Sequence, residues 1–434
     1  MKELLYKAQE MIRESGCADS RLMLFHNIEN NICFMNGKVD KQQRSDSFSL
    51  AVTLYIDGRE GFFYTNVFDD SSLRSFLRQS VMITRMLAPD PARGLIDPAS
   101  YYKGDGPDLH NYDPAFEALT IDNHTAFSLI DAASKIDGRN VVSVDTRYTD
   151  RLHRAHYLCS NGFEATEHST RCTLSTMVSV KGEGDARPMD GWGQTRLFLN
   201  DLTGDMAREI GETAYARTIR KIGQRPVKPG FYTMVVESPV AGHLLMPLFS
   251  AMAGQALQQH SSFLEGKLGK KIGSELLDMV DNPHIPGTRG ATYFDYDGAA
   301  TKPMKLFDRG VLSTYFIDTP MGRKLGMEPT TQGIHHTIMT PSSSSLEDIL
   351  KLHDECILIT DFNGGNCNPV TGHFSYGVEG FHYRNGICVQ PISGMNITGN
   401  MLDIWNHLVQ VSNDADPYEA DLIPSLVFEG VSFK

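Results

Sequence analysis

Cysteine pairs with a recognisable spacing are missing from this sequence. The seven cysteines are odd in number and include no Cys-x-x-Cys arrangement; they are Cys17, Cys33, Cys159, Cys172, Cys356, Cys367 and Cys388. A disulfide framework needs an even and regularly spaced set, whereas scattered thiols are typical of a reducing compartment. We therefore expect free thiols and a cytoplasmic location.

Positive charge is also in short supply. The 434 residues include 40 Lys and Arg against 53 Asp and Glu, which gives a formal net charge of −13 at pH 7. Proteins that bind nucleic acid use basic surfaces to neutralise phosphates. The composition therefore argues against direct binding to DNA or RNA.

A membrane-spanning run and a signal peptide are absent from the pattern as well. The longest apolar segment, residues 239–257, is interrupted by proline, serine, glycine and glutamine, whereas a span needs about 20 predominantly apolar residues. Residues 1–16 lack a continuous apolar core and have the spacing of an amphipathic helix that ends at Gly16. We expect no contact with a membrane.

Three common catalytic motifs do not occur in the sequence. They are Gly-x-Gly-x-x-Gly, the phosphate-binding Gly-x-x-x-x-Gly-Lys-Ser/Thr and the Gly-x-Ser-x-Gly of serine hydrolases. The glycines of the first two motifs let the backbone bind phosphate groups, and the third motif exposes a nucleophilic serine. Nucleotide-dependent and serine-hydrolase chemistry therefore have no support here.

Two proline-rich stretches divide the chain. Residues 88–114 carry five prolines without periodicity, and residues 224–230 (QRPVKPG) carry two more. Such stretches are typical of connections between folded units. We predict an N-terminal α+β domain at 1–110, a middle α+β segment at 111–225 and a β-rich C-terminal domain at 226–434.

Strand-like runs outnumber helical runs, so the expected fold class is α+β with mixed sheets and flanking helices. Helical spacing predicts helices at 71–87, 122–136, 202–223, 346–353 and 401–411. Apolar or alternating runs predict strands near 21–26, 31–35, 47–56, 141–146, 152–159, 165–181 and 195–198. Asn385-Gly386 is the strongest hairpin signal in the chain.

The stretch from Met234 to His260 combines a strand-like start with a nearly uniform apolar helix. Ser238 and Pro239 suit an N-cap and the first helical position, and so apolar a helix belongs inside a large domain. Between Ser238 and His260 there is no Glu, and the histidine pair of His243 and His260 lies far outside ligand spacing. We interpret His243 as a structural histidine.

Other clusters of metal-type residues favour ordinary structural roles. His153, His156 and Cys159 lie on an expected strand, where odd separations place side chains on alternating faces. Three further pairs are adjacent or close in the sequence: His335 with His336, His373 with His382, and Asp295 with Asp297. We expect the adjacent histidines to form hydrogen bonds and the two aspartates to belong to a turn. His373 and His382 bracket a strand with an odd separation, so we expect them on opposite faces.

The loop GGNCNPVTG contains the best candidate for a binding surface. Gly364 and Gly365 would let a peptide backbone approach closely, with Asn366 and Cys367 beside them. Cys367 as a nucleophile would need a base and a lowered thiol pKa, and the sequence does not direct His373 back towards it. We predict substrate binding, rather than chemistry, for residues 364–367.

Several ordered segments together resemble one known family. They include LMLFHNIENNICFMNGKVD near the N-terminus, then DYDGAATKPMKLFDRGVLSTYFID, GGNCNPVTGHFSYGVEGFHYRNG and ITGNMLDIWNHLVQVSNDADP, and finally PSLVFEGVSF. This set resembles the TldD/PmbA family of intracellular metalloproteases and their partners, also described as modulators of DNA gyrase. The resemblance covers essentially the whole chain and implies a multi-segment fold of mixed sheets and flanking helices.

The resemblance also implies a missing metal site. Catalytic members carry HExxxH in the helix that follows the MVVES-like strand, and a cysteine near the C-terminus; the histidines bind zinc and the glutamate activates water. In this sequence Met246, Pro247 and Ala251 occupy the motif positions for the two histidines and the glutamate, and no cysteine follows Cys388. We therefore expect no catalytic residue, metal or cofactor in this chain.

The implied function is that of the PmbA (TldE) branch, a non-catalytic subunit of a cytoplasmic zinc protease. A TldD-type partner would supply the zinc, the substrate would be a peptide, and the chain would form a homodimer or heterodimer. Two alternatives stay open. One is an autonomous metallopeptidase that uses His243, His373 or Cys367, and the other is an interaction protein that modulates DNA gyrase.

Overall fold

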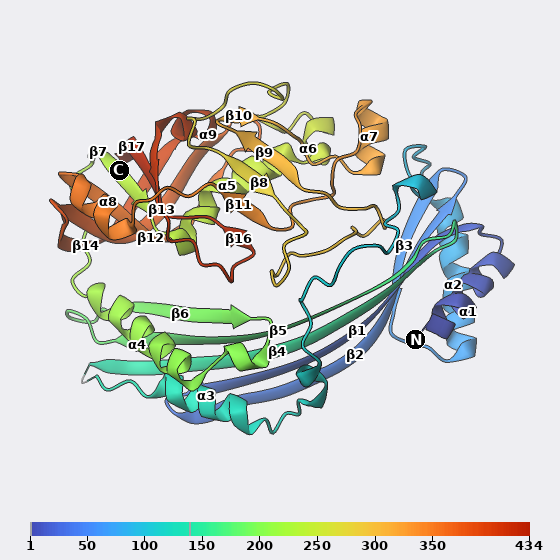
Figure 1. Cartoon of the computed structure of the whole chain (residues 1–434), viewed down its shortest axis with the longest axis horizontal. Helices are drawn as coiled ribbons and strands as arrows, with labels where there is room; N and C mark the ends of the chain where they lie inside the picture. Colours follow the sequence, from blue (N-terminus) through green and yellow to red (C-terminus); the bar gives the residue numbers. More distant parts are fainter. Residues whose placement is uncertain (1, 139) are drawn as a thin grey trace.

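The computed structural model describes residues 2–138 and 140–434 and consists of two parts that face each other (Figure 1). The N-terminal part is a long curved sheet with helices on its outer face. The C-terminal part contains two further sheets with helices around them. The α+β class expected from the sequence is confirmed.

One antiparallel sheet with the order β3-β2-β1-β4-β5-β6 forms the N-terminal part. Its strands are β1 (Asp19–Met35), β2 (Lys38–Ile56), β3 (Arg59–Thr65), β4 (Val141–Cys159), β5 (Glu164–Val180) and β6 (Met189–Arg196). The pairing of β1 with β4 joins segments on either side of the proline-rich connection. Both predicted N-terminal segments therefore contribute to one sheet, and the domain boundary near 110 stays a prediction.

Several strands are longer than the sequence pattern indicates. The β1–β4 register runs without interruption from Arg21 opposite Cys159 to Met35 opposite Asp145, so two predicted pairs of short strands are single strands. The polar middle of β1 broke the apolar pattern. It belongs to the sheet because Asn30 donates a hydrogen bond from Nδ2 to Asp150 Oδ1 across the strands, at 2.8 Å.

Four helices cover the outer face of this sheet (Figure 1). They are α1 (Lys2–Glu14) and α2 (Asp70–Met86) at one end, and α3 (His124–Ser134) and α4 (Gly204–Arg220) at the other. Side chains at even positions of β1 face both groups: Leu22 and Leu24 pack under α1 and α2, and Ile32 and Phe34 under α3 and α4. The opposite, concave face of the sheet is turned towards the C-terminal part.

The C-terminal part is built on a sheet with the order β14-β13-β12-β7-β17-β15 and a smaller sheet with the order β10-β9-β8-β11-β16. Their strands are β7 (Gly230–Val236), β8 (Met279–Asp281), β9 (Met304–Asp308), β10 (Val311–Leu312), β11 (Thr337–Met339), β12 (Glu355–Cys367), β13 (His373–Arg384), β14 (Ile387–Asn400), β15 (Leu408–Val411), β16 (Asp421–Leu422) and β17 (Leu426–Phe433). A shared apolar core joins both sheets to the helix that follows β7.

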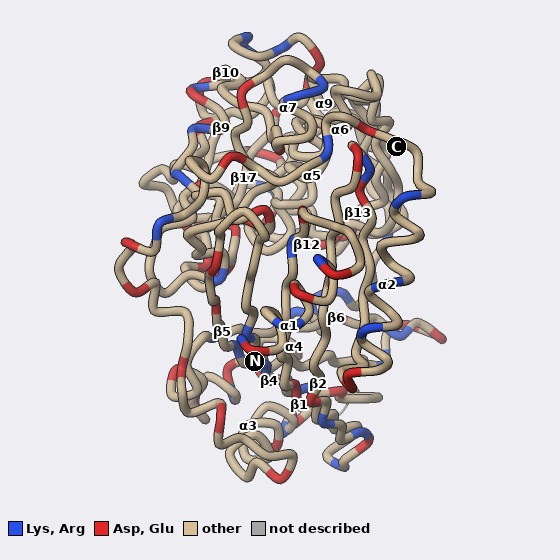
Figure 2. Tube along the Cα trace, turned by 90° about the vertical axis from the view of Figure 1, so that its right-hand side faces the viewer, with Lys and Arg blue, Asp and Glu red and all other residues tan. Residues whose placement is uncertain are grey.

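Short helices connect these strands. The α-helices are α5 (Ser238–Met252), α6 (Gly254–Gln258), α7 (Thr319–Leu325), α8 (Leu346–Leu352) and α9 (Met401–Ile404), and the 3₁₀ helix η4 (Trp405–His407) follows α9. The N-terminal part contains the 3₁₀ helices η1 (Pro98–Ser100), η2 (Pro114–Ala118) and η3 (Leu199–Asp201). Within residues 2–138 and 140–434, every helix is too short or too polar to cross a membrane. Figure 2 shows basic and acidic residues interspersed over both parts.

Two helix predictions need correction. The helix predicted at 401–411 ends after η4 and continues as β15, because Leu408–Val411 pairs with β17 beside the buried Trp405. The helix expected to run on from Ser238 is interrupted at Ala253, where the Gly254 N–H donates to Phe316 O at 2.8 Å. Ser238 is not the N-cap; Glu237 takes that position.

Candidate functional site

Helix α5 carries the positions at which the family resemblance places a metal motif. Met246 is 56% exposed on the outer face of the helix, whereas Ala251 is 2% exposed and belongs to the core. Pro247 lies inside the helix between them, where it can donate no backbone hydrogen bond. Methionine, proline and alanine at these positions provide none of the His or Glu side chains that the family's zinc motif uses.

His243 lies on the outer face of α5 and packs against two aromatic rings. Its ring stacks on Phe362 with centroids 4.4 Å apart and meets Tyr376 edge-on at 4.7 Å. Burial lowers the pKa of His243, because a desolvated imidazole favours its neutral form. This packing supports the structural role that the sequence suggested.

A zinc ion would need a cluster of ligand side chains on this chain. Among residues 2–138 and 140–434, no three His, Cys, Asp or Glu side chains gather closely enough to hold a metal ion. A zinc site needs three or four such ligands. The residues present in the described part of the chain do not fit the metal that the family resemblance implies.

His153 and His156 point to opposite faces of β4, as the strand pattern predicted. His153 Nδ1 lies 2.7 Å from Asn27 Oδ1 on the concave face. His156 Nδ1 lies 3.1 Å from Thr166 Oγ1 on the other face. Cys159 is buried at the end of the strand, so the three residues form no ligand set.

The adjacent histidines of the 333–336 loop both serve hydrogen bonds, as expected. His335 Nδ1 lies 3.0 Å from Asp281 Oδ2, and Asp281 Oδ1 accepts the backbone N–H groups of both histidines. His336 Nδ1 lies 2.7 Å from Ala420 O. Asp281 is completely buried, so it fixes the orientation of the His335 ring.

The remaining pairs also have local partners. Asp295 Oδ1 accepts the N–H groups of Asp297 and Ala299 at 2.9 and 3.0 Å, which is the expected turn chemistry. His382 Nε2 lies 2.7 Å from Glu355 Oε1, whereas His373 is exposed at the start of β13. The two histidines therefore have different surroundings and share no site.

Residues 364–367 form the exposed end of β12. β7 pairs with β12 only as far as Ile359, so Asp361–Cys367 has β13 on one side and no described strand on the other. Gly364 faces open space, whereas a Cβ at Gly365 would lie 2.1 Å from Ser375 O. Burial raises the pKa of Cys367, which argues against a nucleophilic thiolate.

A cleft of about 980 Å³ separates β5 and β6 from the start of α5. Three arginines, Arg147, Arg217 and Arg289, lie among its lining residues. Thr360 also lines it, and its buried hydroxyl has no hydrogen-bond partner among the described residues. The acidic lining residues are Asp145, Asp190, Glu237, Asp361, Asp414, Asp416, Glu419 and Asp421. Sequence reasoning missed this cleft because no local motif connects such distant residues.

Buried ion pairs connect the floor of the cleft to both parts of the molecule. Arg217 of α4 donates to both carboxylate oxygens of Glu237 at 2.9 and 3.1 Å. Lys221 lies 3.1 Å from Asp190 of β6 and 3.0 Å from Glu379 of β13. Burial raises the pKa of Glu237, and the Arg217 charge opposes that rise. We call Asp190, Arg217, Lys221, Glu237 and Glu379 the ion cluster.

Three domain models of one protein family match this chain one after another along its length. The models describe PmbA/TldA metallopeptidase domain 1 at residues 25–84, the central domain at 116–221 and the C-terminal domain at 229–434. The molecule is thus built from domains of the metallopeptidase class. The chain belongs to the PmbA/TldD family, which confirms the resemblance drawn from its sequence.

Known proteins of this family match along most of the chain. The metalloprotease PmbA of Escherichia coli O157:H7 is 25% identical over 88% of this chain and 84% of its own length. A crystal structure from Bacteroides thetaiotaomicron, described as a candidate modulator of DNA gyrase, is 40% identical with a TM-score of 0.95, covering 100% of this chain and 98% of that one. TldE of Thermococcus kodakarensis shares the fold, with a TM-score of 0.85 at 18% identity and 99% coverage of both chains.

Proposed function

We propose that this chain is the non-catalytic, PmbA/TldE-type subunit of a heteromeric zinc metalloprotease in the cytoplasm. A TldD-type partner supplies the zinc ion and the catalytic glutamate, and the pair acts on peptides. The observation that carries the proposal is the outer face of α5. That face presents His243 and Met246, and no described acidic or histidine residues join them as a ligand set.

The similarities support the protease class, and they include both kinds of subunit. Relatives of this chain are named metalloprotease PmbA, and a Buchnera aphidicola protein named as a TldD homologue matches 57% of the chain at 25% identity. Such an assembly divides two tasks between subunits. One chain holds the metal that activates water, and this chain completes the substrate channel.

Reconstitution tests this division directly. The purified chain, a TldD-type protease from the same genome and their mixture are incubated with an unfolded casein and a set of short peptides. We expect cleavage by the mixture and none by this chain alone. Cleavage by this chain alone would contradict the proposal, and so would co-purification of DNA gyrase without any TldD-type chain.

Within the pair, we assign peptide contact to the open edge of β12 at residues 364–367. An extended peptide binds such an edge through main-chain hydrogen bonds, and Asp361–Cys367 has a free side for that purpose. Gly364→Val adds bulk in open space, so it obstructs the edge without displacing a neighbour. We expect peptide turnover by the reconstituted pair to fall at least fivefold.

A matched control separates peptide contact from loss of folding. Gly394→Val introduces the same side chain at another glycine with positive φ and open surroundings on β14. It should cost a similar amount of stability and leave turnover unchanged. Equal turnover by the Gly364→Val pair and the wild-type pair would refute the assignment of the peptide to this edge.

A further inference from the structure

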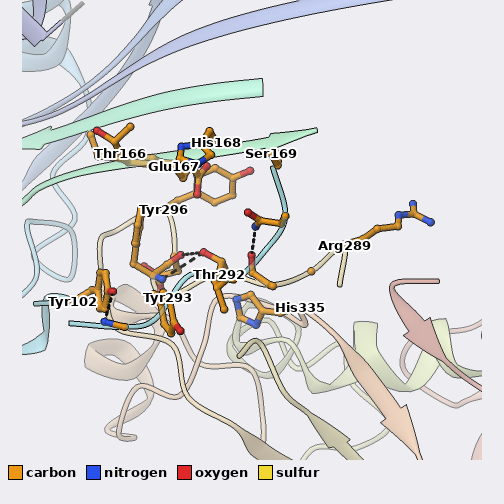
Figure 3. Close-up of a pocket in the computed structure, with 18 of the residues that line it drawn as sticks. Tyr102, Thr166, Glu167, His168, Ser169, Arg289, Thr292, Tyr293, Tyr296 and His335 are labelled. Carbon is orange, nitrogen blue, oxygen red and sulfur yellow. Dashed lines mark hydrogen bonds between the residues drawn. The ribbon is translucent and has the colours of Figure 1, made fainter. Parts of the chain in front are cut away.

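A second cavity lies between the concave face of the long sheet and the C-terminal part (Figure 3). It has a volume of about 820 Å³ and is lined by β5, by the 102–111 connection and by the loops 289–296 and 332–335. Figure 3 shows Glu167 and His168 on one side, and Thr292, Tyr293 and His335 on the other. Small-molecule sites in proteins have volumes of about 300–1,000 Å³.

Aromatic rings form much of the wall of this cavity. Tyr102 stacks on Tyr293 with centroids 5.2 Å apart, and Tyr157 meets Phe294 edge-on at 5.1 Å. Tyr296 is 61% exposed and lines the same space. Aromatic rings offer apolar surface for packing, and the partial negative charge on their faces attracts organic cations.

Acceptor groups without partners lie among these rings. Glu167 accepts a hydrogen bond from the Tyr157 hydroxyl through Oε1 at 2.7 Å. His153 Nε2 lies 3.6 Å from the same oxygen, and the side chain of Glu167 is 32% exposed. Its Oε2 has no hydrogen-bond partner in residues 2–138 and 140–434. His335 lies on the same wall and uses Nδ1 towards Asp281, which leaves Nε2 as the ring nitrogen that faces away from that carboxylate.

Two strong donors of the wall, the side chains of Asn111 and Arg289, already have acceptors. Asn111 donates from Nδ2 to Ala291 O at 3.2 Å, and Arg289 donates to Glu419 at 2.8 Å. The carboxylates of Asp108, Glu167 and Asp295 line the cavity, and the arginine among its described lining residues, Arg289, is paired with Glu419 outside it. A ligand that satisfies this wall must donate hydrogen bonds and carry positive charge.

We infer that this cavity binds a primary amine attached to an aromatic or apolar body. The ammonium group lies against Glu167, and the body packs on the rings of Tyr293 and Tyr296. The same chemistry occurs in a free arylalkylamine and in the amino-terminal residue of a peptide. This site is separate from the β12 edge and does not depend on the proposed protease role. We call it the amine cavity.

Titration calorimetry on the full-length chain tests the inference with four probes. They are phenethylamine, the neutral 2-phenylethanol, the anionic phenylacetate and the dipeptide amide Phe-Gly-NH₂. We expect phenethylamine or the dipeptide amide to bind at least tenfold more tightly than the alcohol, and the anion not to bind. Tighter binding of the dipeptide identifies a peptide terminus, and tighter binding of phenethylamine identifies a free amine.

Variants locate the binding within the cavity. Glu167→Gln keeps an acceptor for the Tyr157 hydroxyl and removes the charge, so amine affinity should fall at least tenfold. Tyr296→Ala removes an exposed ring and should lower it about threefold to tenfold. Glu429→Gln, an exposed change on β17, should leave affinity unchanged. Thermal melting verifies that each variant is folded.

Three results would overturn the inference. The first is no binding of either amine to the wild-type chain. The second is equal affinity for the amine and the alcohol. The third is unchanged amine affinity in a folded Glu167→Gln variant. None of these outcomes bears on cleavage by the reconstituted pair, so a failure here is distinct from a failure of the proposed function.

Discussion

The cleft beside α5 and the amine cavity lie between the same two parts of the molecule, yet they are built differently. Beside the cleft, Arg217 pairs with Glu237 at the N-cap of α5, and Lys221 pairs with Asp190 of β6 and Glu379 of β13. In the amine cavity, Glu167 Oε2 lies among aromatic rings and has no hydrogen-bond partner in the described part of the chain. The charges of the ion cluster beside the cleft connect the two parts of the protein, whereas the Glu167 carboxylate of the amine cavity is available to a ligand.

The sharpest test of this contrast is the loss of Lys221. This lysine is 4% exposed and lies between Asp190 and Glu379. Lys221→Met keeps the aliphatic volume, leaves the half-buried Glu379 without its cation and leaves Asp190 with only Arg217 at 3.6 Å, so we expect unfolding to become about 3–5 kcal/mol easier. Urea unfolding measures the change.

Lys351→Met provides the matched control for that substitution. Lys351 forms an exposed pair with Glu347 one helical turn away, and such pairs contribute about 0.5 kcal/mol or less. A cost below about 1 kcal/mol for Lys221→Met would mean that the ion cluster does not hold the two parts together. The contrast between the two regions would then be lost.

The next largest effect distinguishes two adjacent glycines on the open edge of β12. Gly365 has a φ of +99°, and a Cβ there would lie 2.1 Å from Ser375 O, so Gly365→Ala should cost about 2–4 kcal/mol. Gly364 has a φ of +71° and open surroundings, so Gly364→Ala should cost only about 1 kcal/mol. Comparable losses in urea unfolding would contradict the β12–β13 geometry.

Asp150 is a buried carboxyl that lies outside the ion cluster, and its burial makes the stability of the protein depend on pH. Its Oδ2 has no hydrogen-bond partner among the described residues, and burial raises its pKa from 3.8 to about 6. The folded state therefore holds the proton more tightly than the unfolded chain. The contribution of Asp150 to unfolding free energy falls as pH rises from about 4 to about 6 and stays lower above that range.

Asp150→Asn removes this ionisation and keeps a partner for the Asn30 amide. The difference in stability between variant and wild type should shift in favour of the variant by about 1–3 kcal/mol between pH 4.5 and pH 7.5. Urea unfolding at both pH values measures it, with the exposed Asp40→Asn as control. A difference that does not change with pH would show that Asp150 is not buried as described.

Local patterns in the sequence predicted most of the elements but neither cavity. Asp69 and Thr203 cap helices that the apolar spacing had located, and Asn385-Gly386 forms the β13–β14 hairpin. Helix caps and hairpin turns both lie within a few residues of the element that they specify. The family resemblance added the overall fold, which the solved structures confirm.

The features that the sequence could not predict depend on distant contacts. The polar residues around Asn30 hid the continuity of β1, because their partner Asp150 is 120 residues away. The amine cavity joins Glu167 with His335 through loops that have no periodicity. Pairing across such separations leaves no mark on local spacing, so only the folded chain shows which acceptors are free.

The smallest predicted effect concerns His243, the histidine nearest to the family's metal positions. His243→Phe keeps the stacking on Phe362 and Tyr376 and removes both ring nitrogens. We expect a change in unfolding free energy within about 1 kcal/mol and unchanged cleavage by the reconstituted pair. A loss of cleavage greater than tenfold would give His243 the ligand role of an autonomous peptidase.

The zinc content of the two purified subunits tests the central claim most directly. Each chain is expressed alone with added zinc, passed through a desalting column and analysed by inductively coupled plasma mass spectrometry. We expect well below about 0.1 zinc per copy of this chain and about one per copy of the TldD-type partner, since three ligands or more are needed to retain the ion. Stoichiometric zinc in this chain alone would contradict it.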